Sequence, residues 1–347
     1  MHLYKIKFND KNLNMKVSFF STQPYDIKFF NECNKKFNFD LEYFEPNLDE
    51  HTVNIIEEGT DAICVFVNDK LNEGVIKKLK KRGIKYIALR NAGFNNVDLE
   101  AAKKYEIKVC RVPAYSPQAV AEHTLAMLLT LNRKTHKAYN RVREQNFSLN
   151  GLLGTNIYTK TVGVIGTGNI GRVFCKTIKA LGTNVIAYDL YPNEELKKEG
   201  FQYVTLEELL KQSDIISLHC PLTPETHHII NKQTISLMKN GVYLINTSRG
   251  GLINTLDIID GLKSKKIGAL GIDVYEQEDK LFFRDLSETI IKDDKIQLLL
   301  SFPNVLVTAH QAFFTEEALT QIALVTLDNL RQLSNSNCID NKAAELV

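Results

Sequence analysis

The sequence TVGVIGTGNIGRVFCKTIKALGTNVIAYD, residues 161–189, decides the fold of this chain. A short apolar run, Val162–Ile165, is typical of a buried parallel strand. Three glycines follow it at the GxGxxG spacing: Gly166, Gly168 and Gly171. A helical run comes next, and a second strand, Val185–Tyr188, ends on Asp189. Because these parts stand in the order that a dinucleotide-binding turn requires, the stretch predicts such a turn.

The three glycines have separate physical tasks in a turn of this kind. One makes the tight bend, one lets a pyrophosphate approach the backbone, and one lets the helix pack closely on the strand. The phosphates would accept hydrogen bonds from free N–H groups at the start of the helix, where the dipole favours negative charge. Asp189 would accept from the adenosine ribose hydroxyls and repel a 2′-phosphate, and residues 190–193 contain no Arg to offset that repulsion. The stretch therefore favours NAD over NADP.

Size and composition indicate a soluble protein with two domains. The chain has 347 residues, 44% of them hydrophobic, and a net charge of +2, which gives no reason to expect nucleic acid or an anionic membrane as a partner. The six cysteines are scattered without CxxC or metal-ligand spacing, which predicts reduced thiols in the cytoplasm and no metal site. Neither a bilayer-spanning run nor an apolar signal core is present in the sequence.

Strand and helix patterns alternate along the whole chain, which predicts an α/β fold with parallel sheets. The expected strands on either side of the nucleotide-binding stretch are residues 16–20, 39–44, 62–65, 86–89, 108–111, 215–218, 242–245, 269–273 and 305–308. The expected helices include 73–80, 99–105, a long one at 117–143, 173–181 and a last one at 316–333. We expect two Rossmann-like or flavodoxin-like domains: an NAD-binding domain, 113–308, inserted into a discontinuous substrate domain, 1–112 and 309–347. The ligand cleft is expected at their boundary.

Three polar side chains follow three of these strands, at the ends where open α/β sheets handle ligands. Arg249 could hold a carboxylate through two parallel hydrogen bonds, and His310 could give or take a proton near neutral pH. Glu278 could orient the imidazole and stabilise its protonated form. Taken singly, each residue has an ordinary explanation as a surface charge or a hydrogen-bonded core histidine. Their shared placement favours a catalytic set.

Several motifs, in order from about Met15 to Val347, resemble the D-2-hydroxyacid dehydrogenase family. They are AGFNNVDL at 92–99, VPAYSP at 112–117, AEHT at 121–124, LHCPLTPET at 218–226, NTSRGG at 246–251 and GIDVYE at 271–276. HQAF at 310–313, followed by TEEA at 315–318, is similar to the fermentative D-lactate dehydrogenases of that family.

The resemblance implies roles for particular residues. Arg249 would bind the substrate carboxylate, His310 would donate and accept the proton, and Glu278 would be its partner. The substrate would also be held by the Ala92 and Gly93 amides, Tyr115 and Phe313. The cofactor set implied beside the three glycines and Asp189 comprises Asn169, Ile170, Cys220, Pro221, Thr226, Thr247, Ser248, Arg249 and Asp273. Asp273 would contact the nicotinamide amide, whereas His123 and His219 would serve in packing. Residues 117–155 would make the contact of a homodimer or a dimer of dimers.

The expected activity is the reversible, NADH-dependent reduction of pyruvate to D-lactate, with domain closure excluding water. One alternative is a related dehydrogenase for larger 2-keto acids, such as the one that yields 2-hydroxyisocaproate. Another is a non-enzymatic NAD(H)-sensing protein on the same fold, which would not need all of Arg249, Glu278 and His310. Residues 1–14 precede the family-like sequence and are interpreted as an extension, with a functional strand at Leu3–Phe8 as the lesser alternative.

Overall fold

The computed structural model describes residues 15–347, so the extension at 1–14 and its possible strand lie outside the described residues. The chain divides into two compact units. The first joins the described residues up to Ser116 to Phe314–Val347, and the second is Pro117–Phe313. The boundaries predicted from the sequence, after residues 112 and 308, lie a few residues earlier. The first boundary falls at the start of helix α4 (Pro117–Arg133) because that helix packs on the second unit's sheet.

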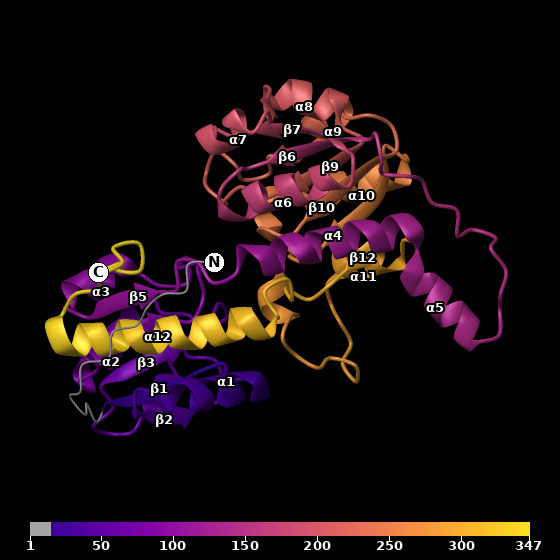
Figure 1. Cartoon of the computed structure of the whole chain (residues 1–347). Helices are drawn as coiled ribbons and strands as arrows, with labels where there is room; N and C mark the ends of the chain where they lie inside the picture. The colour runs from indigo at the N-terminus through magenta and orange to yellow at the C-terminus, as the bar shows by residue number, and fades with distance from the viewer. Residues whose placement is uncertain (1–14) are drawn as a thin grey trace. The chain divides into compact units, whose positions relative to one another are not determined.

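The first unit is built on a parallel sheet of five strands in the order β2-β1-β3-β4-β5 (Figure 1). Its strands are β1 (Lys16–Phe19), β2 (Asp40–Tyr43), β3 (Ala62–Val65), β4 (Tyr86–Leu89) and β5 (Lys108–Arg111). Its helices are α1 (Pro24–Asn34), α2 (Glu73–Lys81), α3 (Leu99–Lys104) and α12 (Glu316–Ser336), with the short 3-10 turn η1 (Thr52–Ile55). This strand order is that of flavodoxin-like sheets.

Helices pack against the sheet of the first unit. Helices α2 and α3 pack on one face against Ile63, Val65, Ile87 and Leu89. Helix α12 contacts α1 as well as β4 and β5, and so brings the end of the chain back to the sheet formed by its beginning (Figure 1). The first unit is therefore discontinuous in sequence. No helix among residues 15–347, in either unit, is long and apolar enough to cross a membrane.

The second unit contains a parallel sheet of seven strands in the order β12-β11-β10-β9-β6-β7-β8. The strands are β6 (Thr161–Ile165), β7 (Asn184–Tyr188), β8 (Gln202–Tyr203), β9 (Ile215–Leu218), β10 (Val242–Asn246), β11 (Ile267–Ile272) and β12 (Val305–Val307). From β6, the chain first extends the sheet to one side and then, from β9 on, to the other. This is the doubly wound order of dinucleotide-binding domains.

Helices cover both faces of the second sheet. Its helices and 3-10 turns are α4, α5 (Thr135–Arg143), α6 (Asn169–Ala180), α7 (Glu194–Lys198), α8 (Leu206–Gln212), α9 (Lys232–Leu237), η2 (Gly250–Leu252), α10 (Thr255–Lys263), η3 (Glu278–Lys280) and α11 (Asp294–Ser301). One apolar core lies between the sheet and α4 and α6, and another includes buried residues of α8, α9, α10 and α11. Together the two units confirm the predicted α/β class with parallel sheets.

Two predicted helices differ from those in the structure. The helix expected over 117–143 is two helices, α4 and α5, because Lys134 between them adopts the left-handed conformation with φ of 52°. The helix expected from Val173 begins earlier, at Asn169, so that its first turn follows directly on the second glycine of the GxGxxG stretch. The strands agree with the sequence analysis to within one or two residues, but β8 was not predicted.

Candidate active site

The glycine-rich turn after β6 has the geometry that its three glycines were expected to provide. Gly166 has φ of 93°, and a Cβ there would lie 2.4 Å from the backbone nitrogen of Cys220. At Gly171 a Cβ would lie 2.0 Å from the carbonyl oxygen of Gly166, so helix and turn touch through backbone alone. Nothing lies within 4 Å of the Cβ position of Gly168. The turn is thus tightly packed at its first and third glycines and open at the second, which fits a pyrophosphate.

This turn lies at the point where the strand order of the second sheet reverses. Strands β6 and β9 are neighbours, and the amide of His219, just after β9, donates to the carbonyl of Ile165 at 2.7 Å. Asn169 and Ile170 form the first turn of α6, where backbone N–H groups have no partner within the helix. Doubly wound sheets bind dinucleotides at such a switch point, on the carboxyl side of the strands.

Asp189 lies just beyond the end of β7 and is joined to the glycine-rich turn. Its Oδ2 accepts hydrogen bonds from the amide and the hydroxyl of Thr167 at 2.6 and 3.0 Å, and its Oδ1 accepts from the amide of Tyr191 at 2.9 Å. Thr167, which stands between the first two glycines, was not predicted to matter. It fixes the carboxylate, which retains lone pairs for ribose hydroxyls.

Other residues expected to line the cofactor are engaged with the backbone. The hydroxyl of Thr226 donates to the carbonyl of Pro221, and that of Ser248 donates to the carbonyl of Cys220, both at 2.7 Å. Thr247 is buried just after β10, and its hydroxyl pairs with that of Thr124 at 2.8 Å. Burial raises the pKa of the Cys220 thiol to about 11, so that the sulfur stays protonated at neutral pH. These side chains shape the loops beside the switch point, while direct contact with a cofactor stays a prediction.

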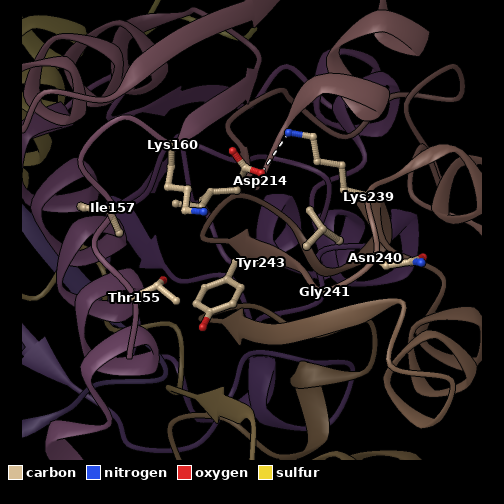
Figure 2. A pocket seen from close by; sticks show the side chains of 10 residues that line it. Thr155, Ile157, Lys160, Asp214, Lys239, Asn240, Gly241 and Tyr243 are labelled. Carbon is tan, nitrogen blue, oxygen red and sulfur yellow. Dashed lines mark hydrogen bonds and ion pairs between the residues drawn. The ribbon is translucent and has the colours of Figure 1, made fainter. Parts of the chain in front are cut away.

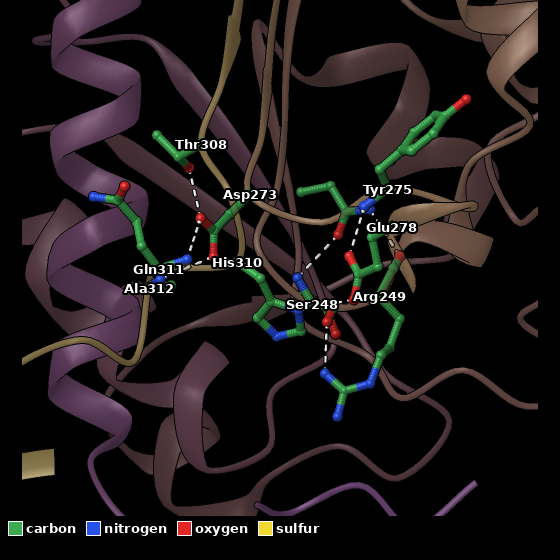
Figure 3. Close-up of polar contacts among 10 residues, drawn as sticks. Ser248, Arg249, Asp273, Tyr275, Glu278, Thr308, His310, Gln311 and Ala312 are labelled. Atoms are coloured by element: carbon green, nitrogen blue, oxygen red, sulfur yellow. Dashed lines mark hydrogen bonds and ion pairs between the residues drawn. The ribbon is translucent and has the colours of Figure 1, made fainter. Parts of the chain in front are cut away.

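The three predicted catalytic residues follow three adjacent strands of the second sheet. Arg249 comes after β10, Glu278 after β11 and His310 after β12. Figure 3 shows the side chains of all three residues in one region. The Nδ1 atom of His310 lies 2.8 Å from Oε1 of Glu278. A carboxylate accepts hydrogen bonds, so Nδ1 carries the hydrogen and Nε2 is left to exchange a proton with a substrate. The second oxygen of Glu278 accepts from the amide of Tyr275 at 2.9 Å, which fixes the carboxylate.

Arg249 sits in a turn that is tied down on both sides. The Asn246 side chain donates to the carbonyl of Arg249 at 2.8 Å and accepts from the amide of Ser248 at 3.0 Å. One guanidinium nitrogen of Arg249 donates to the carbonyl of Ser248 at 2.7 Å. The turn is fixed by these bonds, and the other guanidinium N–H groups could form the paired bonds that a carboxylate accepts.

Asp273 holds the segment that carries His310. Its side chain is fully buried, and its two oxygens accept from the Thr308 hydroxyl at 2.6 Å and from the amides of Gln311 and Ala312 at 2.8 and 2.9 Å. The amide of His310 donates to the Asp273 carbonyl at 2.7 Å. His310 has φ of 52°, a conformation that few non-glycine residues adopt, and Asp273 stabilises it (Figure 3). The nicotinamide contact expected for Asp273 stays a prediction.

His123 and His219 contact neighbouring polar side chains rather than Arg249, Glu278 or His310 in the hydrogen bonds of the structure. The Nε2 atom of His123, on α4, lies 3.2 Å from the Thr308 hydroxyl and 3.5 Å from the Asp273 carboxylate. Burial alone would raise the pKa of Asp273, but hydrogen bonds, chiefly from His123 and Thr308, outweigh it and lower that pKa. His219 pairs with the Ser217 hydroxyl at 2.8 Å, and burial lowers its pKa to about 3, so its ring is neutral.

The predicted substrate residues are divided between the two units. Ala92, Gly93 and Tyr115 belong to the first unit, and Phe313 is buried at the end of the second. After β4, the side chain of Asn91 donates to the Gly93 carbonyl at 2.6 Å and closes a short turn around Ala92. The structure thus brings together Arg249, Glu278 and His310 with the cofactor turn in one unit. The roles of Ala92, Gly93 and Tyr115 stay predictions.

A cavity of about 180 Å³ lies at the amino ends of the strands of the second sheet, away from the carboxyl ends that carry the candidate site. Figure 2 shows the side chains that line it. It is lined by residues at the starts of β9 and β10 and just before β6, including Lys160, Asp214 and Tyr243. Lys239, which also lines it, pairs with Asp214 at 2.9 Å. None of the predicted site residues lines this cavity, so it forms no part of the candidate active site.

Comparisons with known proteins show which proteins the chain as a whole is similar to. The profile of the D-isomer specific 2-hydroxyacid dehydrogenase NAD-binding domain matches residues 125–312. A 2-hydroxyacid dehydrogenase homolog of Haemophilus influenzae is 52% identical over 94% of this chain and 98% of its own length. D-lactate dehydrogenase of Escherichia coli is 50% identical over 94% and 99%. The solved structure of a pyruvate reductase of Chlamydomonas reinhardtii superposes with a TM-score of 0.90 at 45% identity, over 94% of this chain and 98% of its own.

Proposed function

Since the chain belongs to the D-isomer specific 2-hydroxyacid dehydrogenase family and is an NAD-dependent oxidoreductase, we propose that it reduces pyruvate to D-lactate with NADH, reversibly. The observation that carries the proposal is the His310–Glu278 pair beside Arg249, at the carboxyl ends of three adjacent strands of the nucleotide-binding sheet. The names of the similar D-lactate dehydrogenase and pyruvate reductase support the choice of pyruvate.

The cofactor site fits NAD on the geometry of the chain itself. The turn is open at Gly168 and closed at Gly166 and Gly171, which suits a pyrophosphate above the first turn of α6. In this proposal the amides of Asn169 and Ile170 bind the pyrophosphate, and Asp189 binds the adenosine ribose. The loops that carry Cys220, Pro221, Thr226, Thr247 and Ser248 line the rest of the cofactor, with Asp273 near the nicotinamide.

The proposed chemistry assigns one task to each of the three polar residues. Arg249 binds the pyruvate carboxylate through two hydrogen bonds and so orients the carbonyl group. NADH, when bound, supplies the hydride that the carbonyl carbon receives. As the electron pair of the C=O double bond moves to oxygen, His310 Nε2 gives that oxygen its proton, and Glu278 stabilises the imidazolium before the transfer. The fixed positive ring lies where negative charge develops, which favours the transition state.

We place the protein in the cytoplasm as a homodimer or a dimer of dimers. All six cysteines are free thiols, which is the usual state in a reducing compartment. Six large apolar side chains of α5 and the segment after it are exposed, and such a concentration is typical of an interface.

The decisive test measures NADH oxidation by the purified protein with pyruvate, 2-ketobutyrate, 2-ketoisocaproate and phenylpyruvate, followed by chiral analysis of the product. We expect the highest kcat/KM with pyruvate, and D-lactate as its product. Preference for a bulkier acid would keep the chemistry but replace the substrate. Tight NADH binding without turnover of any of the four would contradict the proposed enzyme.

A further inference from the structure

Glu276 lies two residues before Glu278 and makes contacts that none of the roles above requires. Its Oε1 atom lies 2.7 Å from Nε2 of His228. Its Oε2 atom accepts hydrogen bonds from the Thr255 amide at 2.9 Å and from the Thr255 hydroxyl. Three segments that are far apart in the sequence therefore meet at one carboxylate: the loop after β9, the start of α10 and the loop after β11.

The loop after β11 carries Glu278, and the chain that leads from β10 into α10 carries Arg249. Arg249 precedes Gly250, and a Cβ at Gly250 would lie 2.1 Å from the carbonyl carbon of Tyr275 and 2.4 Å from the Glu276 nitrogen. The backbone beside Arg249 thus touches the backbone of the turn that carries Glu278. The carboxylate of Glu278 accepts from the amide of Tyr275 within the same turn. A shift of that turn would move Glu278, and through it His310, relative to Arg249.

The third segment is fixed to the same place by His228. Its amide donates to the Gly251 carbonyl at 2.8 Å, and its carbonyl accepts from the Asn231 side chain at 2.9 Å. Its φ is 52°, and its ring lies against that of His227, with centroids 3.8 Å apart and the ring planes tilted by 31°. These contacts fix the imidazole as a donor to Glu276, although its backbone conformation is one that histidine seldom adopts.

We propose that Glu276 and His228 are positioning residues that set the distance of the Arg249 turn from the Glu278–His310 pair. The inference rests on the proposed function, because it concerns the geometry of the same site. Neither residue touches the reacting atoms in the proposal. Each acts through the segments that it holds together.

The environment of Glu276 supports this role. The carboxylate lies at the N-terminus of α10, where the helix dipole favours a negative charge. Burial alone would raise the pKa of Glu276, but the hydrogen bonds from Thr255 and His228 outweigh it and lower that pKa. Glu276 is therefore charged at neutral pH and can accept all three bonds at once.

The test compares Glu276→Ala, Glu276→Gln and His228→Gln in the full-length protein, with Glu207→Ala as the matched control. Glu207 also forms an ion pair in the second unit, with Lys211, but that pair is exposed on α8. We expect Glu276→Ala to lower kcat/KM for pyruvate at least tenfold while the Kd for NADH changes less than twofold, because misplacement of positioned groups mainly affects the chemical step. Glu276→Gln, which can still accept from Thr255, should recover part of the loss, as should His228→Gln, whose amide can still donate.

A second readout needs no substrate. The 15N signals of the His310 ring, assigned with His310→Asn, report which ring nitrogen carries the hydrogen in the neutral form. We expect the Nδ1–H tautomer in the wild type and a mixture of tautomers in Glu276→Ala. If the wild type lacks pyruvate turnover but the tautomer changes, only the proposed function fails. If kcat/KM and the tautomer both stay as in the wild type, the positioning role is overturned. Should Glu276→Ala not fold, Glu276→Gln and His228→Ala decide by the same two readouts.

Discussion

At the scale of single residues, the role proposed for Arg249 depends on the orientation of its guanidinium as well as on its positive charge. Its turn is fixed by Asn246, so in the proposed mechanism the guanidinium would approach the substrate from a defined direction. We expect Arg249→Lys to lower kcat/KM roughly a hundredfold, because lysine keeps the charge but loses the paired bonds that orient a carboxylate. Steady-state kinetics with pyruvate measure this, and Arg331→Lys is the control, because Arg331 forms an ion pair with Asp328 on α12. A rate equal to that of the wild type would remove Arg249 from the mechanism.

Glu278 is expected to act on His310 through charge as well as position. Glu278→Gln can retain a contact with Nδ1 but not the negative charge that stabilises the imidazolium. The reduction rate of this variant should therefore begin to fall at a lower pH than that of the wild type, since the ring loses its proton more readily. Profiles of kcat/KM against pH, recorded at saturating NADH, test this. Superimposable profiles would show that the carboxylate does not act on the proton.

At the scale of elements, two glycines of the turn between β6 and α6 are expected to serve different purposes: Gly171 lets the helix pack, and Gly168 leaves room for the cofactor. Gly171→Ala places a methyl group 2.0 Å from the Gly166 carbonyl, so α6 must move. We expect it to lower the free energy of unfolding by about 1–3 kcal/mol and to weaken NADH binding. A methyl group at Gly168 meets no atom within 4 Å, so Gly168→Ala should change stability little. The same methyl group would occupy the space proposed for the pyrophosphate, so the variant should bind NADH more weakly. Urea unfolding and NADH fluorescence titration measure the two effects. An equal loss of stability in both variants would contradict the assignment of packing to Gly171 and cofactor binding to Gly168.

The first unit depends on a buried charge that joins the loops after its strands. Arg90, 2% exposed, follows β4, donates to the Ser21 carbonyl at 2.7 Å and lies 3.3 Å from Asp26. Burial raises the pKa of Asp69, which Arg90 partly offsets. Arg90→Met would leave these carboxylates without their cation, so we expect a loss of about 3–5 kcal/mol in the free energy of unfolding. Lys104→Met, which breaks an exposed pair, should change nothing measurable in the same urea titration. A loss below 1 kcal/mol in Arg90→Met would show that the buried Arg90–Asp26 pair is not needed for the stability of the first unit.

The elements that could be predicted from the sequence are those whose structure leaves a clear pattern in the order of residue types. Buried parallel strands are continuous apolar runs, so β6 and β9 could be located within a residue or two. The break between α4 and α5 could not, because a left-handed lysine such as Lys134 has no compositional signature. Strand β8, with two residues, is too short to show a pattern. Residue type and position made Arg249, Glu278 and His310 candidates, and the structure pairs two of them, Glu278 and His310. The contacts of Thr167, Asp273 and Glu276 depend on which segments meet in space, and spacing along the chain does not reveal that.

At the scale of the whole molecule, exposed apolar side chains gather on one segment of the second unit. No residue of α5 is buried, and large apolar side chains continue beyond it. The exposed set is Tyr139, Val142, Phe147, Leu149, Leu153 and Tyr158. Leu149 and Leu153 are 81% and 87% exposed, which costs free energy in water unless another surface covers them.

A second copy of this chain is the partner that the proposed dimer requires at these side chains. We expect the double variant Leu149→Ser, Leu153→Ser to shift the protein from dimer to monomer at micromolar concentration, measured by light scattering during size-exclusion chromatography. Ile290→Ser is the control, because Ile290 is 88% exposed in the same unit but outside the segment, so it should leave the dimer intact. A wild type that stays monomeric at all concentrations, or a double variant that dimerises as well as the control, would show that this surface is not the interface. If the variant is monomeric and retains its kcat, the active site is complete within one chain.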